Sequence, residues 1–377
     1  MWNDSLVVDG VTHAYEWTPD NRADGLSEED YTNVLDFLWR QTHLLTETKE
    51  PGWPLNFQEF TTKFTAEAIA QIYIEETEVD MIVYHDVEIG GFFKRGTSPL
   101  STGEELKRRY PDRVFLYAFA DPFRGKAELD RMEEKASSGL VDGFKFYPTD
   151  GVFNIETGKV NTMLYDDPEL AYPYLQKALD LGIKHVGVHK AFPVAPGGNV
   201  QDRVEDIGVA AEAFPDLTFE IVHSGWAFLE DCALQLMLNP NIYANLELTA
   251  NFAVRRPRQC AEAIGELLRV GNTDDRLIWA TGIPNGHPQP VLESFANMEM
   301  PEDLVEGQDL PVLTDELKKK MLGANFLNLH GVDIEDRKQR IAGDEWDQQR
   351  AAARERGDDG IHWRAQRENA GTLVGAA

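Results

Sequence analysis

The segments Val186-Gly187-Val188-His189 and Phe219-Glu220-Ile221-Val222-His223 are two short apolar runs, and each ends in a histidine. Apolar runs of this length are typical of buried strands in a parallel sheet. In α/β barrels, the side chains that carry function lie at the carboxyl ends of the strands. The two histidines therefore predict a functional site, and their imidazole groups suit a metal ion.

Six further runs share this pattern, and two of them contain a histidine at the same end. They span residues 6–13, 81–85, 114–119, 143–146, 242–248 and 276–282. Segments with helical periodicity lie between the runs, at 104–109, 127–138, 168–181, 204–214, 227–238 and 258–270. Alternating strands and helices predict an α/β fold, in which eight parallel strands close as a (β/α)8 TIM barrel. The alternative is an open doubly wound sheet, but its usual glycine fingerprint after the first strand is absent.

Two regions stand outside this repeat. Residues 17–80 are too long for one connection and are rich in aromatic residues, including Trp39, Trp53 and Phe57. We expect them to form a helical insertion after strand 1 that covers the barrel mouth and selects the substrate. Residues 333–377 are charged and predict a peripheral helical tail after a barrel domain of residues 1–332. We expect a homo-oligomer, with this tail as a candidate contact.

The 377-residue chain has 36 Lys and Arg residues against 65 Asp and Glu residues, a net charge of −29 at pH 7. This charge repels phosphate backbones and anionic lipids, so we expect a small-molecule substrate and neither nucleic acid nor a membrane as partner. The two cysteines, Cys232 and Cys260, form no disulfide or metal-binding pattern. The first residues lack the features of a signal peptide, and we expect a cytoplasmic protein.

Several motifs occur in the order in which one family of barrel enzymes has them. Residues 9–16 (Asp-Gly-Val-Thr-His-Ala-Tyr-Glu) are similar to its opening Asp-x-Asp-x-His-x-x-Glu, and residues 143–148 to its Gly-x-Lys-x-His-Pro. Residues 188–189 and 222–225 match its two histidine strands, residues 277–284 lie where it has Gly-Ser/Thr-Asp-x-Pro, and residues 321–326 resemble its closing Gly-x-Asn. From Leu6 to Asp333, the chain thus resembles the amidohydrolase superfamily, in the amidohydrolase 2 branch that includes aminocarboxymuconate-semialdehyde decarboxylase-like proteins. The resemblance implies a TIM barrel with a metal-dependent hydrolase or decarboxylase activity.

The chain departs from the family pattern at two positions. Val11 stands at the first ligand position of the opening motif, and an aliphatic side chain cannot bind a metal. Gly282 stands where the family has the strand-eight aspartate, which acts as ligand and general base. The site must therefore differ from the conventional mononuclear one.

We expect His13, Glu16, His189 and His223 to be the metal ligands. Neutral imidazole suits Zn, Fe or Mn, and histidines from neighbouring barrel strands can converge on one ion. Glu16 follows His13 by three residues and would either add an oxygen ligand or orient His13. The expected cofactor is a divalent metal ion (Zn, Fe or Mn), with one or two ions per chain.

Glu247, Lys145 and His287 are the candidate catalytic residues. Glu247 ends the seventh run, beside Gly282, and would replace the missing aspartate, although an ion pair with Lys145 or Arg255 is an alternative. Lys145 is either a carboxylated bridging ligand or a cation for the substrate, and His287 lies in a loop beyond Gly282. His85 and Asp86 are weaker candidates. The remaining histidines, His43, His185, His330 and His362, we interpret as structural.

These residues predict a metal-dependent hydrolase that cleaves an ester, thioester, lactone or amide bond of a bulky apolar substrate. A metal ion makes hydroxide available near neutral pH and polarises the scissile carbonyl. A dinuclear site would tolerate the loss of the strand-eight aspartate. One alternative is nonoxidative decarboxylation of an aromatic or enoic acid, for which Gly282 is unfavourable. The other is a non-catalytic barrel that acts as a binding protein.

Overall fold

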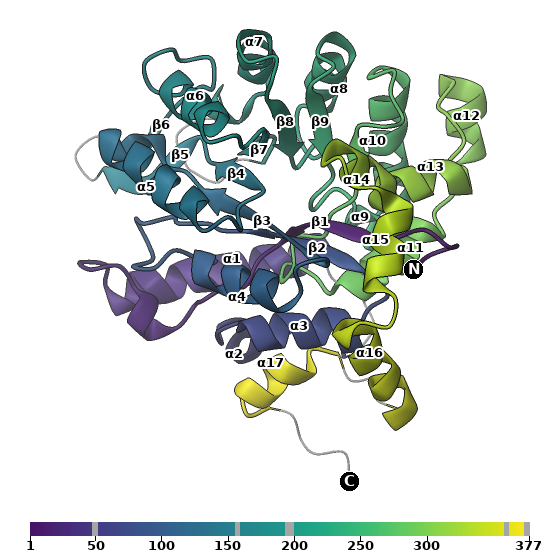
Figure 1. Ribbon diagram of the computed structural model, residues 1–377, viewed down its shortest axis with the longest axis horizontal. Helices are drawn as coiled ribbons and strands as arrows, with labels where there is room; N and C mark the ends of the chain where they lie inside the picture. The colour runs from purple at the N-terminus through teal and green to yellow at the C-terminus, as the bar shows by residue number, and fades with distance from the viewer. Residues whose placement is uncertain (47–51, 155–158, 193–199, 358–361, 373–377) are drawn as a thin grey trace.

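A ring of parallel strands surrounded by helices forms the centre of the computed structural model, which describes residues 1–46, 52–154, 159–192, 200–357 and 362–372 (Figure 1). The eight strands follow the order β1-β2-β3-β4-β7-β8-β9-β10. Their bounds are β1 Val8–Thr12, β2 Met81–His85, β3 Val114–Phe119, β4 Gly143–Phe146, β7 His185–His189, β8 Thr218–Val222, β9 Ile242–Asn245 and β10 Leu277–Ile278. The predicted (β/α)8 TIM barrel is confirmed.

The barrel closes at a seam between β1 and the residues around β10. β10 itself holds only two residues, so most of the closing hydrogen bonds come from the segment that follows it. These bonds run from the N–H groups of Gly10, Gly282 and His13 to the carbonyl oxygens of Trp279, Val11 and Ile283, at 3.1, 3.1 and 3.0 Å. The seam therefore brings His13 next to the chain that follows β10.

Helices cover the outside of the barrel because each buries one apolar stripe. In α10 (Pro257–Arg269), Cys260, Ile264 and Leu267 recur at helical spacing and are fully buried. The other crossover helices are α4 Leu100–Arg109, α5 Lys126–Ser137, α6 Tyr172–Asp180, α7 Glu205–Ala213 and α8 Leu229–Leu238. Short helices follow β9 and β10: α9 Phe252–Arg255, α11 Pro288–Ala296, α12 Glu302–Gln308, α13 Asp315–Lys319, the π-helix η4 Lys320–Ala324 and α14 Asn325–Leu329.

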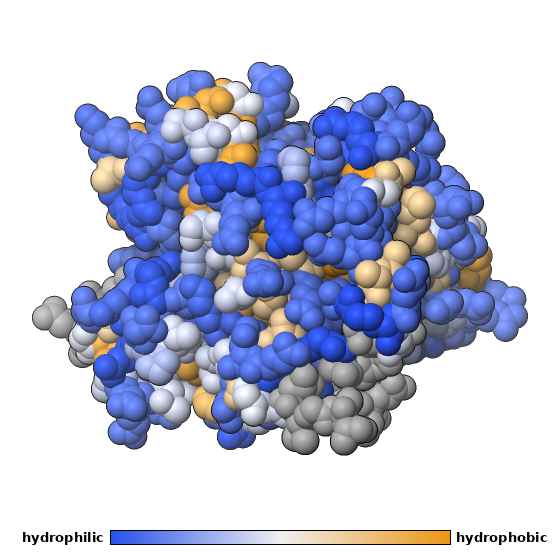
Figure 2. All heavy atoms as spheres, turned by 60° about the horizontal axis from the view of Figure 1, so that its bottom comes forward, coloured by the Kyte–Doolittle hydropathy of each residue, from blue (hydrophilic) through white to orange (hydrophobic). Residues whose placement is uncertain are grey.

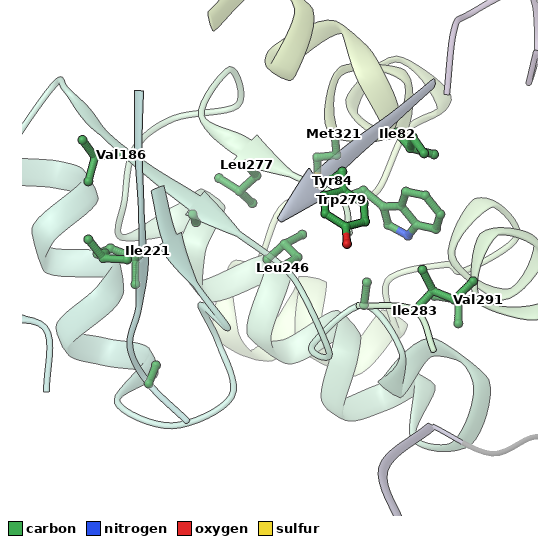
Figure 3. Packing of buried hydrophobic residues seen from close by; sticks show 14 of the residues in the cluster. Ile82, Tyr84, Val186, Ile221, Leu246, Leu277, Trp279, Ile283, Val291 and Met321 are labelled. Carbon is green, nitrogen blue, oxygen red and sulfur yellow. The ribbon is translucent and has the colours of Figure 1, made fainter. Parts of the chain in front are cut away.

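Large apolar side chains fill the space between the strands and these helices. Figure 3 shows Trp279 beside Ile283 and Val291, where the last strand meets α11. Trp279, Ile283 and Val291 are each at most 1% exposed. Burial of such side chains is the main stabilising contribution, so the ends of the strands are held on a rigid base.

The insertion between β1 and β2 is helical, as the sequence predicts. It contains η1 Pro19–Asn21, α1 Glu28–Thr46, α2 Phe57–Phe60 and α3 Ala66–Glu75. The Asn56 side chain begins α2 with a capping box, because it accepts from the N–H of Glu59 while the Glu59 carboxylate accepts from the N–H of Asn56. A second insertion that the sequence does not predict is an antiparallel hairpin after β4, formed by β5 Thr149–Asn154 and β6 Lys159–Thr162.

The tail packs more closely on the barrel domain than its polar composition suggests. Its helices α15 (Ile334–Ile341), α16 (Glu345–Arg356) and α17 (Arg364–Asn369) include neighbours of α3, at the lower side of Figure 1. Trp346 and Trp363 are at most 2% exposed. The Arg113 guanidinium, which precedes β3, donates to Asp344 at 2.8 Å and to Asp347 at 2.7 Å. The described tail residues are therefore part of the folded unit.

Hydrophilic residues cover most of the face in Figure 2, with apolar residues in small patches between them. This fits a chain in which acidic residues are distributed along its whole length. None of the helices in the described ranges is both long and apolar enough to cross a membrane.

Candidate active site

Four neighbouring strands end in a sharp turn of the same kind. One residue within four positions after each of β7, β8, β9 and β10 has positive φ: Ala191 (56°), His223 (69°), Leu248 (60°) and Gly282 (68°). Such values are uncommon for residues other than glycine and tend to occur at functional sites. At this end of the barrel, His189 at the end of β7 and His223, Glu247 and Leu248, which follow β8 and β9, line a common cavity.

Three of the predicted metal ligands meet there. Nε2 of His223 lies 3.1 Å from Nδ1 of His189, and the other ring nitrogen of His189 lies 2.9 Å from the Phe192 carbonyl oxygen. His13 comes from β1 and is oriented by a contact of 3.0 Å between its Nδ1 and the His85 carbonyl oxygen. All three histidine residues are at most 3% exposed.

Glu247 connects two of these histidines. Its Oε1 lies 3.8 Å from Nε2 of His13, and its Oε2 lies 3.6 Å from Nδ1 of His223. Burial opposes ionisation of this carboxyl group, but His223, His13 and Lys145 together outweigh that effect and lower its pKa to about 2. Burial lowers the pKa of His223 to about 4 despite Glu247. At neutral pH, the Glu247 carboxylate therefore faces the neutral imidazole of His223.

Lys145 and His85 lie deeper in the barrel. Both lie beside Gly187 of β7, where a Cβ would be at ordinary contact distance, 3.4 Å from Cδ of Lys145 and 3.5 Å from Cε1 of His85. Neither Nζ of Lys145 nor either ring nitrogen of His85 has a hydrogen-bond partner among the described residues. Burial lowers the pKa of Lys145 to about 8, although Glu247 and Glu220 oppose the shift.

The structure does not bring Glu16 or His287 to these histidines. The Glu16 carboxylate is paired with Arg95 and, at 2.9 Å, with Lys63. Both ring nitrogens of His287 are engaged, because Nδ1 accepts from the N–H of Gln289 and Nε2 contacts Glu76 at 2.9 Å. The roles predicted for Glu16 as a ligand and His287 as a base stay predictions, with partners that compete for the same atoms.

The secondary candidate Asp86 and three of the four histidines interpreted as structural also have partners. Asp86 accepts from the N–H of Phe119 at 2.9 Å. His185 contacts Thr218, His330 contacts the Tyr117 hydroxyl and His362 stacks on Trp53. The side chain of His43 lies outside the described residues.

A cavity of about 540 Å³ opens above the cluster, and His13, His189, His223 and Glu247 form part of its lining. Its walls are largely apolar, and α1 of the insertion contributes Val34, Phe37 and Leu38. The described lining contains no Lys or Arg residue. Trp39, Trp53 and Phe57, which the sequence analysis expected at the mouth, are not in this lining, because Trp39 packs on Phe57 and Trp53 on His287.

Tyr15, Tyr147 and Phe192 are among the aromatic residues of the lining that sequence reasoning missed. Tyr15 stacks on His13 with ring centroids 5.3 Å apart, and Tyr147 stacks on His189 at 4.4 Å. Tyr15 and Tyr147 each follow a predicted site residue, His13 and Lys145, by two positions. The two-residue period of an extended chain was a signal that could have found them.

The chemistry of this donor set fits a divalent cation. Two ligands that each lie ~2.1 Å from one tetrahedral ion are roughly 3.4 Å apart, close to the 3.6 and 3.8 Å that separate Glu247 from His223 and His13. Nδ1 of His223 is buried and has no hydrogen-bond partner in the described part of the chain. As the side chains stand, however, no three His, Cys, Asp or Glu residues of the described ranges form a metal-holding group. Because both ring nitrogens of His189 have contacts, one of these contacts would have to open for His189 to bind the ion.

Comparisons with known proteins agree with this architecture. An uncharacterized TIM-barrel protein from Bordetella bronchiseptica is 18% identical, with a TM-score of 0.56 over 86% of this chain and 99% of that chain. A putative metal-dependent hydrolase from Lactobacillus casei is 12% identical, with a TM-score of 0.52 over 90% of this chain and 97% of that chain. At these identities, the likeness shows the fold alone. No curated protein matches the chain.

The family model described as Amidohydrolase matches residues 97–326, which is more than half of the chain. The matched segment includes Lys145 in β4, His189 at the end of β7, and His223 and Glu247, which follow β8 and β9. It agrees with the motif resemblance that the sequence carries from Leu6 to Asp333. The chain belongs to the amidohydrolase family.

Proposed function

We propose that the protein is a metal-dependent hydrolase that cleaves an ester, thioester, lactone or amide bond of a bulky, uncharged substrate. One observation carries this proposal: three buried histidines and a carboxylate line a cavity of about 540 Å³ whose walls are largely apolar. The membership in the amidohydrolase family supports an enzyme of this kind.

His13, His189 and His223 would hold the metal, and Glu247 would provide the negative charge beside it. A bound divalent ion supplies hydroxide near neutral pH and polarises a carbonyl group. Low imidazole pKa values favour the neutral rings that bind metals, because burial lowers the pKa of His223 to about 4 and that of His189 well below its ordinary value.

Lys145 would act as a buried cation beneath the metal-binding histidines. Its Nζ lies 5.6 Å from the centre of the Tyr147 ring, which itself lines the cavity. An ammonium group without a hydrogen-bond partner in a site is available to a developing negative charge on the substrate. This arrangement supports an electrostatic role for Lys145 rather than a role in proton transfer alone.

The cavity walls support an uncharged and apolar substrate. Phe37, Leu38 and Phe92 offer apolar contact area, and the described lining contains no cationic side chain that would pair with a free carboxylate. This lining supports hydrolysis of a neutral bond. In the alternative, decarboxylation of an aromatic or enoic acid, the metal ion or Lys145 would have to hold the free carboxylate.

The test combines metal analysis with an isotope experiment. Protein purified without added metal is analysed for its elements, stripped with a chelator and titrated with Zn²⁺, Mn²⁺ or Fe²⁺. Turnover of aryl esters, lactones, anilides and acyl-CoA thioesters is then followed in H₂¹⁸O. We expect metal-dependent incorporation of ¹⁸O into the acid product, with the titration endpoint giving one or two ions per chain.

Two outcomes would contradict the proposal. Release of CO₂ from an aromatic acid, without ¹⁸O in the organic product, would establish the decarboxylase. A protein that binds the apolar ligands but contains no metal and turns over no compound of the panel would be a binding protein.

A further inference from the structure

Gly282 has no side chain, and the Glu247 carboxyl group occupies the space in which one would lie. A Cβ atom built on Gly282 would overlap Oε1 of Glu247 and would lie 2.8 Å from its Cγ and 3.0 Å from its Cδ. Contacts this short do not occur, so any side chain at position 282 must displace Glu247. The two residues follow neighbouring strands, β10 and β9, and are therefore sterically matched.

The displaced group would be the carboxylate that connects two histidines. Glu247 is the one acidic residue among the described residues that line the cavity. Its two oxygens point to different rings, with Oε1 3.8 Å from His13 and Oε2 3.6 Å from His223. No second carboxylate in the described lining could take its place.

We propose that Glu247 is the anionic ligand of the metal centre and that Gly282 is the positioning residue that admits it. This inference rests on the proposed metal-dependent function and names the residues that give the site its charge. In this arrangement, the carboxylate reaches the metal from β9, and the absence of a side chain after β10 is a requirement of the site.

The first experiment measures Zn²⁺ affinity by calorimetry on the apo protein. Glu247→Gln keeps the shape of the side chain and removes its charge, and we expect the affinity to fall at least roughly tenfold. Gly282→Ala should lower it by a similar factor, because the new methyl group moves the carboxylate away. The double variant should bind no more weakly than either single variant, since both changes remove the same contact.

A matched control separates displacement of Glu247 from backbone strain. Gly139 has the same φ of 68° as Gly282, but a Cβ there would meet no atom within 4 Å. Gly139→Ala therefore introduces the same left-handed strain far from the cavity. We expect it to lower thermal stability about as much as Gly282→Ala does through strain, while Zn²⁺ affinity stays at the wild-type value.

The second experiment moves the carboxylate from one strand to the other. Aspartate tolerates left-handed backbone better than most residues, so Gly282→Asp is sterically acceptable once Glu247 is truncated. We expect Glu247→Ala/Gly282→Asp to recover at least part of the Zn²⁺ affinity lost in Glu247→Ala. Gly282→Asp alone should bind Zn²⁺ more weakly than the wild type, because two carboxylates then compete for one volume.

The results distinguish this inference from the function on which it rests. Wild-type affinity in both Gly282→Ala and Glu247→Gln, together with lost binding in His223→Ala, would overturn the inference and leave the metal site standing. Absence of Zn²⁺ binding in the wild type, or unchanged binding in His223→Ala, would overturn both.

Discussion

The two ends of the barrel use buried charge in opposite ways. At the amino ends of β1, β2 and β3, Arg113 and Asp80 are at most 3% exposed and have several partners. Arg113 donates to Asp344, Asp347 and two carbonyl oxygens, and Asp80 accepts from the N–H of Val7. At the carboxyl ends, Lys145, His85 and His223 are as deeply buried, yet each has a nitrogen without a hydrogen-bond partner in the described structure.

This difference separates stability from function within one fold. A buried charge with all its partners in place fixes a structure, whereas a buried polar atom without a partner costs free energy unless something else binds it. The orphaned nitrogens of Lys145, His85 and His223 at the carboxyl ends of the strands are therefore a sign of a ligand. The opposite end holds the tail and the first three strands together.

The largest expected effect comes from removing the buried cation at the amino ends of the strands. Arg113→Met removes one cation and leaves Asp80, Asp344 and Asp347 without it, which should lower the free energy of unfolding by about 3–5 kcal/mol. Urea unfolding measures this loss. Arg109→Met is the matched control, because the exposed Arg109 contacts Glu345 of the same tail helix and should cost less than about 1 kcal/mol. Equal losses would contradict the assignment of stability to Arg113.

The second prediction compares two histidines at opposite ends of the same strand, β7. His189 ends β7 and His185 begins it. We expect His189→Ala to lower metal affinity and turnover at least roughly 100-fold, since it removes a proposed ligand. His185→Ala should keep both within about twofold. Metal analysis of the two purified variants decides the point, and equal metal content would contradict the proposed site.

A third effect is a pH dependence of stability at Glu128. The Glu128 side chain is buried without a hydrogen bond in the described residues, and burial raises its pKa to about 7 although Lys135 and Arg124 oppose the shift. A raised pKa means that the contribution of this group is present below pH ~4.5 and is lost as the pH rises through ~7. The wild type should therefore lose stability relative to Glu128→Gln as the pH rises from ~4.5 to ~7. The difference between their free energies of unfolding should change by roughly 1–3 kcal/mol over this range. Parallel pH profiles from chemical denaturation would contradict it.

The smallest effect is a gain in stability at the site itself. Lys145→Met replaces a buried ammonium group by an apolar side chain of similar length. We expect the free energy of unfolding to rise by about 1 kcal/mol while turnover falls at least roughly tenfold, as is common where a site is strained for function. A loss of stability in Lys145→Met would show that the ammonium group is held by interactions that the fold needs.

The sequence was sufficient for the barrel, because strands and helices are encoded by short-range periodicity. It also predicted the positions of His13, His189 and His223 at strand ends. The hairpin after β4 and the close packing of the tail were missed, since both depend on long-range contacts. Trp346 and Trp363 of the tail are apolar residues in a polar segment, and that was the available signal for its burial.

The cavity walls could be predicted only in part. The aromatic insertion was recognised, but which face of α1 is turned to the site depends on how the helix packs. Thus Phe37 and Leu38 line the cavity while the adjacent Trp39 packs on Phe57. The partners of Glu16 and His287 likewise come from residues distant in the chain, Arg95 and Glu76. The match between Gly282 and Glu247 is visible only once the backbone is placed.

The seam between β1 and the segment after β10 joins parts of the chain that are synthesised at different times. A ribosome releases the chain from its amino end, so His13 emerges some 270 residues before Ile283, to whose carbonyl oxygen its N–H is bonded. Until that later segment arrives, the first strand has one neighbour, β2, and the histidine has no Glu247 beside it. The ring of donors and the seam are therefore completed only after the segment around Ile283 has been synthesised, and a metal ion captured by all of these donors would mark a closed barrel.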